Sequence, residues 1–534
     1  MTDVVVEEEN GNGGNGEGEE WRPKYNAWLV AFVVTMAAFM EILDTTIVNV
    51  SLPHIAGSLS STYDDATWTL TSYLVANGVV LTISGWLSKV FGRKRYFIIC
   101  LVMFTATSFL CGMATSLGNL VIFRLLQGIF GGGLQPTQQA IILDSFPPEK
   151  RAAAFGLTSI AAIVGPVLGP TLGGWITDNF SWRWVFFVNI PFGILTTLAV
   201  MVVLEDPPWA KKQKAPMDTV GISLITLGFG ALEVMVDRGE DADWFGSNFI
   251  CTMAVLALLG LGGAVAWLLY TDQPAVDLHV FCDKNFAVGT FLVGAIGSIL
   301  YASAIIVPQF AQQIMGYTAT LSGLVLSPGG IAVIMLIPFV QWLMGVITVR
   351  SVIAIGFALL GGALFYSAHL LPLLDFKHLV LFRISQTACL AFLFVPLSTV
   401  AYSTIPQYLN ADASALFSMS RNVFGSLAIS GAMALVTERR QAQQAHTVHW
   451  MTNYHPPYNE ALTQAQAFMQ GRGLSEAAAQ SAANHWMYKQ FLLQTAMLAY
   501  NEVFIILGIV SFLCIPFCFM LSPITESGKV RATH

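Results

Sequence analysis

The sequence predicts an all-α polytopic membrane protein with fourteen transmembrane helices. The mean hydropathy is +0.64, 55% of the 534 residues are hydrophobic and only 11% are charged. Soluble domains carry about 25% charged residues. The chain also divides into apolar runs of about 20 residues, the length of a helix that crosses a bilayer. The seven cysteines are scattered without metal-ligand spacing, so neither disulfides nor a metal site is expected.

The fourteen predicted spans have centres near Ala38, Ala76, Phe104, Gly131, Val164, Gly193, Thr226, Leu259, Ile299, Ile331, Leu360, Leu393, Gly425 and Gly508. An even number of spans places both termini on one side. Fifteen of the 25 Lys and Arg residues then fall on that side, seven on the other and three inside spans. The positive-inside rule therefore assigns both termini to the cytoplasm. The acidic, Gly-rich and Asn-rich tract in residues 1–25 predicts a disordered tail without a signal peptide, and residues 522–534 form a second tail.

The chain repeats internally. Residues 123–127 (FRLLQ) match residues 382–386 (FRISQ), and residues 85–87 (GWL) match residues 341–343 (QWL) at a similar separation. The matches fall in corresponding spans only if the seventh and eighth spans are inserted between two halves of six. The predicted units are a first half, an inserted pair and a second half with a long outer segment, at residues 26–205, 206–272, 273–521 and 437–493.

The fifth span carries a glycine motif, G-x8-G-x3-GP-x2-GG. It consists of Gly156, Gly165, Gly169, Pro170, Gly173 and Gly174. Three of these glycines are four residues apart, so one helix face has almost no side chain and allows close approach of a second membrane helix. The expected partner is the tenth span, which contains Gly323, Ser327 and Gly330. The motif resembles the antiporter signature of major facilitator drug:proton exporters, although generic small-residue packing is an alternative reading of the same face.

Three further motifs extend the resemblance. The loop after the second span resembles the family's inner loop, G-x-L-A-D-R-x-G-R-[KR], through Gly85, Gly92, Arg93, Lys94 and Arg95. Lys89 stands where the family has an acid, so the charge relay ascribed to that acid is not carried over. The basic residues are expected either to anchor the loop at the inner leaflet or to gate transport. Residues 43–53 resemble the first-helix signature of drug:proton exporters, and residues 182–191 the segment that follows the antiporter motif.

With fourteen spans, the chain is identified as a member of the EmrB/QacA type of the major facilitator superfamily. The resemblance implies a major facilitator fold of two six-helix halves plus an inserted helix pair. It also implies export of lipophilic or cationic small molecules across the bacterial inner membrane, driven by protons and without a cofactor. In EmrB-like proteins the partner is a periplasmic membrane-fusion adaptor joined to an outer-membrane channel. Residues 437–493 are expected to be helical, with Ser475 as a cap, and to contact the adaptor or to form a lid. No nucleic-acid partner is expected.

Charges inside the spans mark the expected chemistry, because burying them in a membrane is costly. Glu41 and Asp44 are three residues apart and share a helix face. Arg124 in the fourth span lies at a similar depth, and by the family resemblance this span neighbours the first. Burial opposes ionisation of Asp44, whereas a nearby guanidinium favours it. This competition suits a group that loads and releases a proton. A static buried ion pair is the alternative, and Glu41 is an additional acid that could read a cation or share the proton.

The cavity wall is expected to include Tyr73 and Asn77, which share one face of the second span. Arg383 and Arg421 are weaker candidates for the same wall. Glu233 belongs to the inserted pair and is therefore expected outside the central path.

The sequence thus predicts a proton-coupled multidrug exporter that works by alternating rocking of two halves. A narrow-specificity exporter of a metabolite or siderophore on the same fold is the alternative, and a membrane sensor without transport is a third possibility. No nucleophile–base pair, Walker loop or metal cluster supports an enzyme.

Overall fold

The computed structural model describes residues 24–208, 217–240, 242–369, 374–452 and 454–522. These ranges contain helices and no strands. The tails predicted at the two ends of the chain lie almost entirely outside the described residues.

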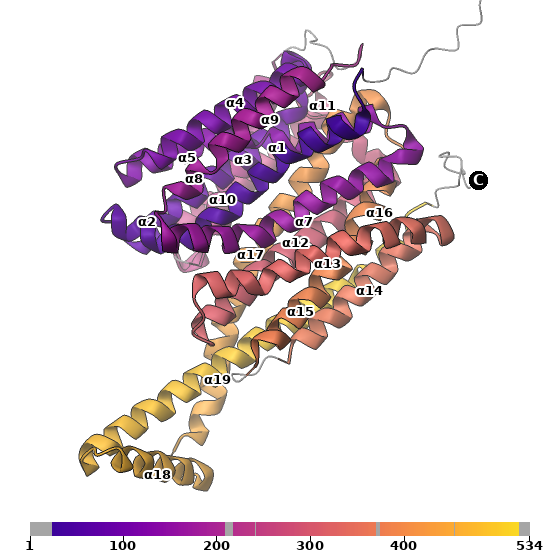
Figure 1. Cartoon of the computed structure of the whole chain (residues 1–534). Helices are drawn as coiled ribbons and strands as arrows, with labels where there is room; N and C mark the ends of the chain where they lie inside the picture. The colour runs from indigo at the N-terminus through magenta and orange to yellow at the C-terminus, as the bar shows by residue number, and fades with distance from the viewer. Residues whose placement is uncertain (1–23, 209–216, 241, 370–373, 453, 523–534) are drawn as a thin grey trace, which may run out of the picture.

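The first half consists of helices from six predicted spans, with short helices at two of the connections (Figure 1). They are α1 (Ala27–Ile47), α2 (Leu52–Ser58), α3 (Tyr63–Phe91), α4 (Arg93–Gly112), α5 (Leu117–Gly131), α6 (Leu134–Ser145), α7 (Pro148–Asn179), α8 (Trp184–Phe187) and α9 (Asn189–Val203). Side chains that accept backbone N–H bonds start several of these helices, as N-caps do. Asn26 caps α1, Thr62 caps α3 and Ser116 caps α5.

The second half follows the inserted pair α10 (Thr219–Arg238) and α11 (Asn248–Tyr270). Its helices are α12 (Lys284–Gln313), α13 (Ala319–Val346), α14 (Val349–Ser367), α15 (Phe376–Cys389), α16 (Ala391–Ala401), α17 (Asn410–Thr447), α18 (Pro456–Gly471), α19 (Glu476–Leu513) and α20 (Ile515–Cys518). Helix α13 runs unbroken through Pro328 and Pro338, which a membrane helix tolerates when its neighbours satisfy the freed backbone groups.

Thirteen helical segments among the described residues are long and apolar enough to cross a membrane. The remaining predicted span, near Gly425, is α17. It has 38 residues but carries several buried polar side chains, so composition alone does not identify it as a span. Helix α17 packs between α3, α6, α12 and α19. Its polar side chains are therefore sheltered by protein and not by lipid.

The two halves meet along two lines of helix contacts. Helix α7 of the first half packs against α13 and α16, and α17 of the second half packs against α3 and α6. The inserted helices α10 and α11 pack closely on each other, and α10 also contacts α3 and α17. The inserted pair is therefore attached to both halves through α10. One face of α10 lies where the first and second halves meet.

The long outer segment forms a helical protrusion, which we define as residues 437–493. Figure 1 shows that α18, the end of α17 and the start of α19 extend beyond the helix bundle, at the end opposite to the start of α1. The predicted helix after Ser475 is present and continues into the last span as one helix of 38 residues. Ser475 occupies the N-cap position, but its side chain makes no capping hydrogen bond. The predicted cap position is confirmed, and the Ser475 backbone carbonyl accepts the first hydrogen bond of the helix, from Ala479.

Candidate functional site: a buried acid cluster beside a central cavity

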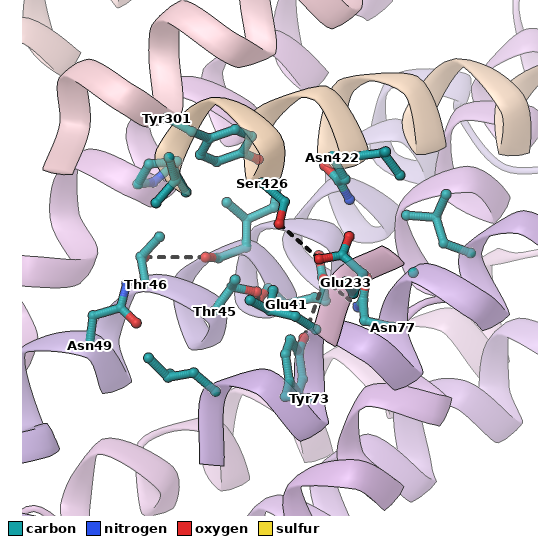
Figure 2. A pocket seen from close by; sticks show the side chains of 18 of the residues that line it. Glu41, Thr45, Thr46, Asn49, Tyr73, Asn77, Glu233, Tyr301, Asn422 and Ser426 are labelled. Atoms are coloured by element: carbon teal, nitrogen blue, oxygen red, sulfur yellow. Dashed lines mark hydrogen bonds between the residues drawn. The ribbon is translucent and has the colours of Figure 1, made fainter. Parts of the chain in front are cut away.

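A cavity lies between the two halves, lined by α1, α3, α7, α10, α12 and α17. Its wall is largely apolar, with a small set of polar side chains that face one another in Figure 2. Figure 2 labels Glu41, Thr45, Thr46, Asn49, Tyr73, Asn77, Glu233, Tyr301, Asn422 and Ser426, and Arg124 and Gln135 also line the cavity. Ligand sites typically combine apolar walls with a few convergent polar groups. The two residues expected from the sequence in this wall, Tyr73 and Asn77, both line it.

Asp44 forms a fully buried ion pair with Arg124 immediately beside this cavity. The Nη1 atom of Arg124 lies 2.6 Å from Oδ2 of Asp44, and both side chains are 0% exposed. Two neutral amides hold the other carboxylate oxygen. Gln127 donates to Asp44 Oδ1 at 3.1 Å and Asn189 donates to the same oxygen at 2.7 Å. Donors from α5 and α9 therefore fix one carboxylate of α1.

The guanidinium of Arg124 is held from several sides. Its Nε donates to the carbonyl oxygen of Thr69 at 3.2 Å, and its Nη1 donates to Gln127 at 2.9 Å. The ring of Tyr73 lies under the guanidinium, 4.1 Å from its centroid, which is cation–π geometry. Arg124 therefore connects α5 to α1 and α3. Moving its charge would disturb all three helices.

Glu41 lies one turn before Asp44 and faces the cavity. Its Oε1 accepts hydrogen bonds from Tyr73 at 3.2 Å and from Asn77 at 2.9 Å, and its Oε2 accepts one from Gln135. The side-chain amide oxygen of Gln135, Oε1, in turn accepts a hydrogen bond from Arg421 of α17. These hydrogen bonds connect an acid of the first half to a cation of the second half. The charge on Glu41 is therefore coupled to Arg421 across the interface.

Arg421 is not among the residues that line the cavity, and Arg383 does not line it either, contrary to the position expected for both in the wall. Arg383 is buried in α15, where its Nη1 donates to Ser303 at 2.9 Å and to Gln386 at 3.2 Å. The internal repeat explains this position. Ser303 and Arg383 each follow Asp44 and Arg124 by 259 residues, so the second half repeats the arginine site with a serine in place of the acid.

The glycine face of α7 packs against α1. A Cβ atom on Gly165 would lie 2.5 Å from the side chain of Ile42, and one on Gly173 would lie 2.5 Å from the carbonyl oxygen of Ile47. A Cβ on Gly169 would overlap Thr46. The expectation that this face meets the tenth span is therefore wrong. Helix α13 contacts a different face of α7, where Gly323 abuts Thr171.

The remaining positions of the glycine motif lie on both sides of this contact. Gly156 approaches Gln341 of α13, Pro170 lines the cavity, and Gly174 is buried within α7. The motif helix thus separates the cavity acids on α1 from the second half on α13.

The inner-loop residues join the two halves at the end that the charge bias assigns to the cytoplasm. Lys89 of α3 lies 2.5 Å from Asp412 of α17, and a Cβ on Gly85 would touch the same aspartate. Asn410 of α17 donates to Asp144 at 3.0 Å. The family's charge relay was not expected in this chain, because Lys89 stands where the family has an acid. The structure places an acid of the opposite half against that lysine.

Around this contact, the basic residues of the motif organise the start of α4. Gly92 has a φ of 83°, which permits the sharp turn between α3 and α4. Arg93 pairs with Asp144, and the backbone N–H of Lys94 donates to Asp206 at 2.7 Å. Burial raises the pKa of Asp206, while the Lys94 amide and the nearby guanidinium of Arg93 offset part of that rise. Arg95 is exposed.

Sequence reasoning missed several members of the cluster. Asn189 lies in the segment that follows the antiporter motif, and Gln127 lies in the repeated FRLLQ stretch, so both had a motif as a signal. Gln135 had none. Glu233 was expected outside the central path, yet it lines the cavity. That expectation is wrong because α10 packs between α3 and α17.

Comparison with known proteins agrees with this architecture. The family model of the Major Facilitator Superfamily matches residues 34–429. The multidrug export protein EmrB of Escherichia coli (strain K12) is 32% identical over 510 residues, covering 93% of this chain and 98% of that protein. The fatty acid resistance protein FarB of Neisseria gonorrhoeae is 33% identical over 503 residues, covering 94% and 97%.

The fold also matches solved transporters. The crystal structure of a peptide transporter, POT, superposes with a TM-score of 0.56 at 13% identity, covering 94% of this chain and 98% of that one. At this identity the likeness concerns the fold alone. Together with the family model and the two relatives, it leads to one conclusion. The chain belongs to the major facilitator superfamily and, within it, to the family of EmrB-like proteins.

Proposed function

We propose that this protein exports lipophilic small molecules across the bacterial inner membrane in exchange for protons, by alternating access of one central cavity. The observation that carries the proposal is the position of Glu41. It places an acid in the cavity wall, one turn from the buried Asp44–Arg124 pair. A substrate in the cavity and a proton on these acids can therefore influence each other directly.

Protonation of Asp44 would cancel its attraction for Arg124. The pair joins α1 to α5, and α1 also packs against α7 along the glycine face. Loss of the ion pair therefore loosens α1 within its half, while Glu41 signals to Arg421 of the other half through Gln135. A ligand shifts such an equilibrium only through its differential affinity for the two states. Protons and substrate would each supply that difference at this cluster.

We assign the structure to one state of the proposed cycle from the contacts between its halves. The ion pair between the halves, Lys89–Asp412, lies at the inner end beside the Asn410–Asp144 hydrogen bond, whereas Thr320 donates to Asp178 across the halves at the outer end. The cavity residues of α1 and α3 lie in the outer parts of those helices. This arrangement suits the state that releases substrate outward and takes up a proton.

A narrower substrate range is the second candidate. It is favoured by one relative, FarB, which is named for fatty acid resistance and is as similar to this chain as EmrB is. The two candidates share the same site and differ only in the shapes that the apolar wall accepts.

We further propose that the protrusion contacts a periplasmic membrane-fusion adaptor, which would connect this transporter to an outer-membrane channel. The helical protrusion extends past the bundle, at the end that the charge bias assigns to the outside (Figure 1). Helix α18 packs against α19 through the small residues Ala465, Ala479 and Ala483, so the protrusion has its own packed contact.

Flux measurements on purified protein in proteoliposomes test the central proposal. Several unrelated lipophilic dyes would be loaded, and a proton gradient would be imposed and then collapsed with an uncoupler. We expect gradient-dependent movement of more than one dye, with protons moving in the opposite direction. Movement of a single chemical class would select the narrow-specificity candidate. Dye flux that is indifferent to the gradient would contradict proton coupling.

A further inference from the structure

We propose that Glu233 of the inserted helix pair binds the cationic group of lipophilic cations in the central cavity. The inference rests on the proposed function, because it assumes that the cavity holds the exported molecule. It assigns to α10 a part of the substrate site, in addition to its role as an attachment to the bundle.

The position of Glu233 supports this assignment. Helix α10 packs against α3 and α17, and Glu233 lies on the face directed at them. The residue is 6% exposed, and its Oε2 accepts a hydrogen bond from Ser426 of α17 at 2.8 Å. Figure 2 shows the carboxylate beside Ser426, Asn422 and Asn77, within the cavity wall. The acid therefore faces the substrate space and not lipid.

The charge environment separates Glu233 from the other two acids of the site. Asp44 already has a guanidinium at 2.6 Å. Glu41 already accepts three hydrogen bonds, one of them through an amide that Arg421 also contacts. Among the described residues, Glu233 has a single neutral donor and no cation within ion-pair distance.

An uncompensated carboxylate at this depth is costly. A buried charge without a partner is destabilising, and Asp237, one turn further along α10, adds a second negative charge nearby. A bound cation would remove this cost. The ligand-side group that fits is therefore a positive charge, attached to a body that fills the apolar wall.

The wall around Glu233 fits such a body. Tyr301 lines the same cavity, and aromatic rings attract cations. Its apolar residues include Ile42, Leu70, Leu74, Ile305, Met419 and Val423. Methionine and branched aliphatic side chains adapt to different shapes. The combination selects for charge at one point and tolerates varied bulk around it.

The competing role for Glu233 is that of a second proton carrier. The two roles predict different losses. A cation subsite affects only substrates that carry positive charge, whereas a proton carrier affects the coupling of every substrate. If Glu233 had only a structural role, its replacement would weaken the binding of neutral and charged ligands alike, because the protein would misfold.

The test uses two probes of similar shape, the tetraphenylphosphonium cation and neutral triphenylphosphine oxide. Binding of each to the purified full-length protein would be measured for wild type, Glu233→Gln and Glu233→Asp. Glu240→Gln, which removes one charge in the loop after α10, is the control. We expect Glu233→Gln to weaken binding of the cation about tenfold or more. Glu233→Asp should retain much of it, and the oxide should bind all variants equally.

Three outcomes of the binding comparison would overturn the inference, and one outcome of a flux measurement would do so as well. The three are unchanged cation binding by Glu233→Gln, equal loss of both probes, or failure of the wild type to prefer the cation. Loss of gradient-driven flux of the neutral oxide in Glu233→Gln would instead assign a proton to this residue and also overturn it. Absence of gradient-driven flux in the wild type contradicts the proposed export function, and the binding comparison still reports separately on Glu233.

Discussion

At the residue scale, the buried carboxylate of Asp44 has little freedom. Arg124, Gln127 and Asn189 all donate to it, and no part of it is exposed. Its geometry is that of a buried ion pair fixed by hydrogen bonds and not that of a solvated acid. Such a pair can serve as a static link between helices, or it can open when the acid takes up a proton. Only a change of charge distinguishes these roles.

Replacing Asp44 with asparagine should abolish gradient-driven efflux while the protein remains folded in the membrane. Asparagine keeps the shape, but it cannot cycle a proton and it leaves Arg124 without its counter-charge. Proton-coupled flux in proteoliposomes is the measurement. Asp272→Asn, an exposed acid in the loop after α11, is the control and should transport as wild type does. Full proton-coupled efflux by Asp44→Asn would return the pair to a static role.

The internal repeat sharpens this view of single residues. The positions of Asp44, Ser108, Arg124 and Gln127 recur 259 residues later as Ser303, Ser367, Arg383 and Gln386. In both halves the arginine donates to the glutamine three residues on. The second half keeps the cation and lacks the acid. The repeat therefore concentrates the proposed proton chemistry in the first half.

At the element scale, the helices and their order follow from the sequence, whereas their neighbours do not. Long apolar runs are local signals, and they predicted the thirteen described segments that are long and apolar enough to cross a membrane, whereas α17 is present as a predicted helix whose composition does not mark it as a span. A glycine face states only that something packs closely there. The residues that fill it, Ile42, Thr46 and Ile47 of α1, have no sequence signature as partners. For the same reason, α10 was recognised as inserted while the direction of Glu233 was missed.

Gly169→Leu should destabilise the protein by about 1–3 kcal/mol, as overpacking does. The new side chain would collide with Thr46 across the contact between α7 and α1. Thermal unfolding of the purified protein and its yield in the membrane measure the effect. Gly262→Leu is a matched control, because a Cβ there meets nothing within 4 Å. Equal stability of the two variants would contradict the close packing of α7 on α1.

At the scale of the whole molecule, an ion pair joins the two halves at their inner end, and its first-half member is a lysine at the position where the family has an acid. Lys89 belongs to the first half and Asp412 to the second. The lysine is partly exposed and the aspartate is 1% exposed, so the pair closes the inner end over a buried acid. The family motif predicted an anchor or a gate at this loop. The contact between halves favours the gate.

Lys89→Asp should therefore open the inner end and reduce transport, because two carboxylates would then face each other. The double variant Lys89→Asp/Asp412→Lys should recover transport, since it restores opposite charges. Flux and the reaction of an inner-end cysteine probe with a soluble reagent are the measurements. If the double variant loses as much transport as Lys89→Asp and Asp412→Lys lose together, the two residues act independently.

The protrusion raises the question of what part of the molecule performs transport. Residues 437–493 extend the ends of two spans and leave the helix packing of both halves in place. Replacing residues 445–490 with a flexible Gly/Ser linker should therefore preserve proton-coupled flux in proteoliposomes. The same change should remove drug resistance in cells, where extrusion past the outer membrane needs an adaptor. The control is a variant in which Gly and Ser replace only residues 451–455, so that α18 and α19 are kept.

The two readouts separate the possible roles of the protrusion. Loss of resistance with intact flux in proteoliposomes assigns the segment to adaptor contact. Retention of both resistance and adaptor pull-down would contradict that contact. Loss of flux in proteoliposomes would instead make the segment a part of the transport cycle. It would then act as a lid, because α19 is continuous with the last span and would carry motion of the protrusion directly into the bundle.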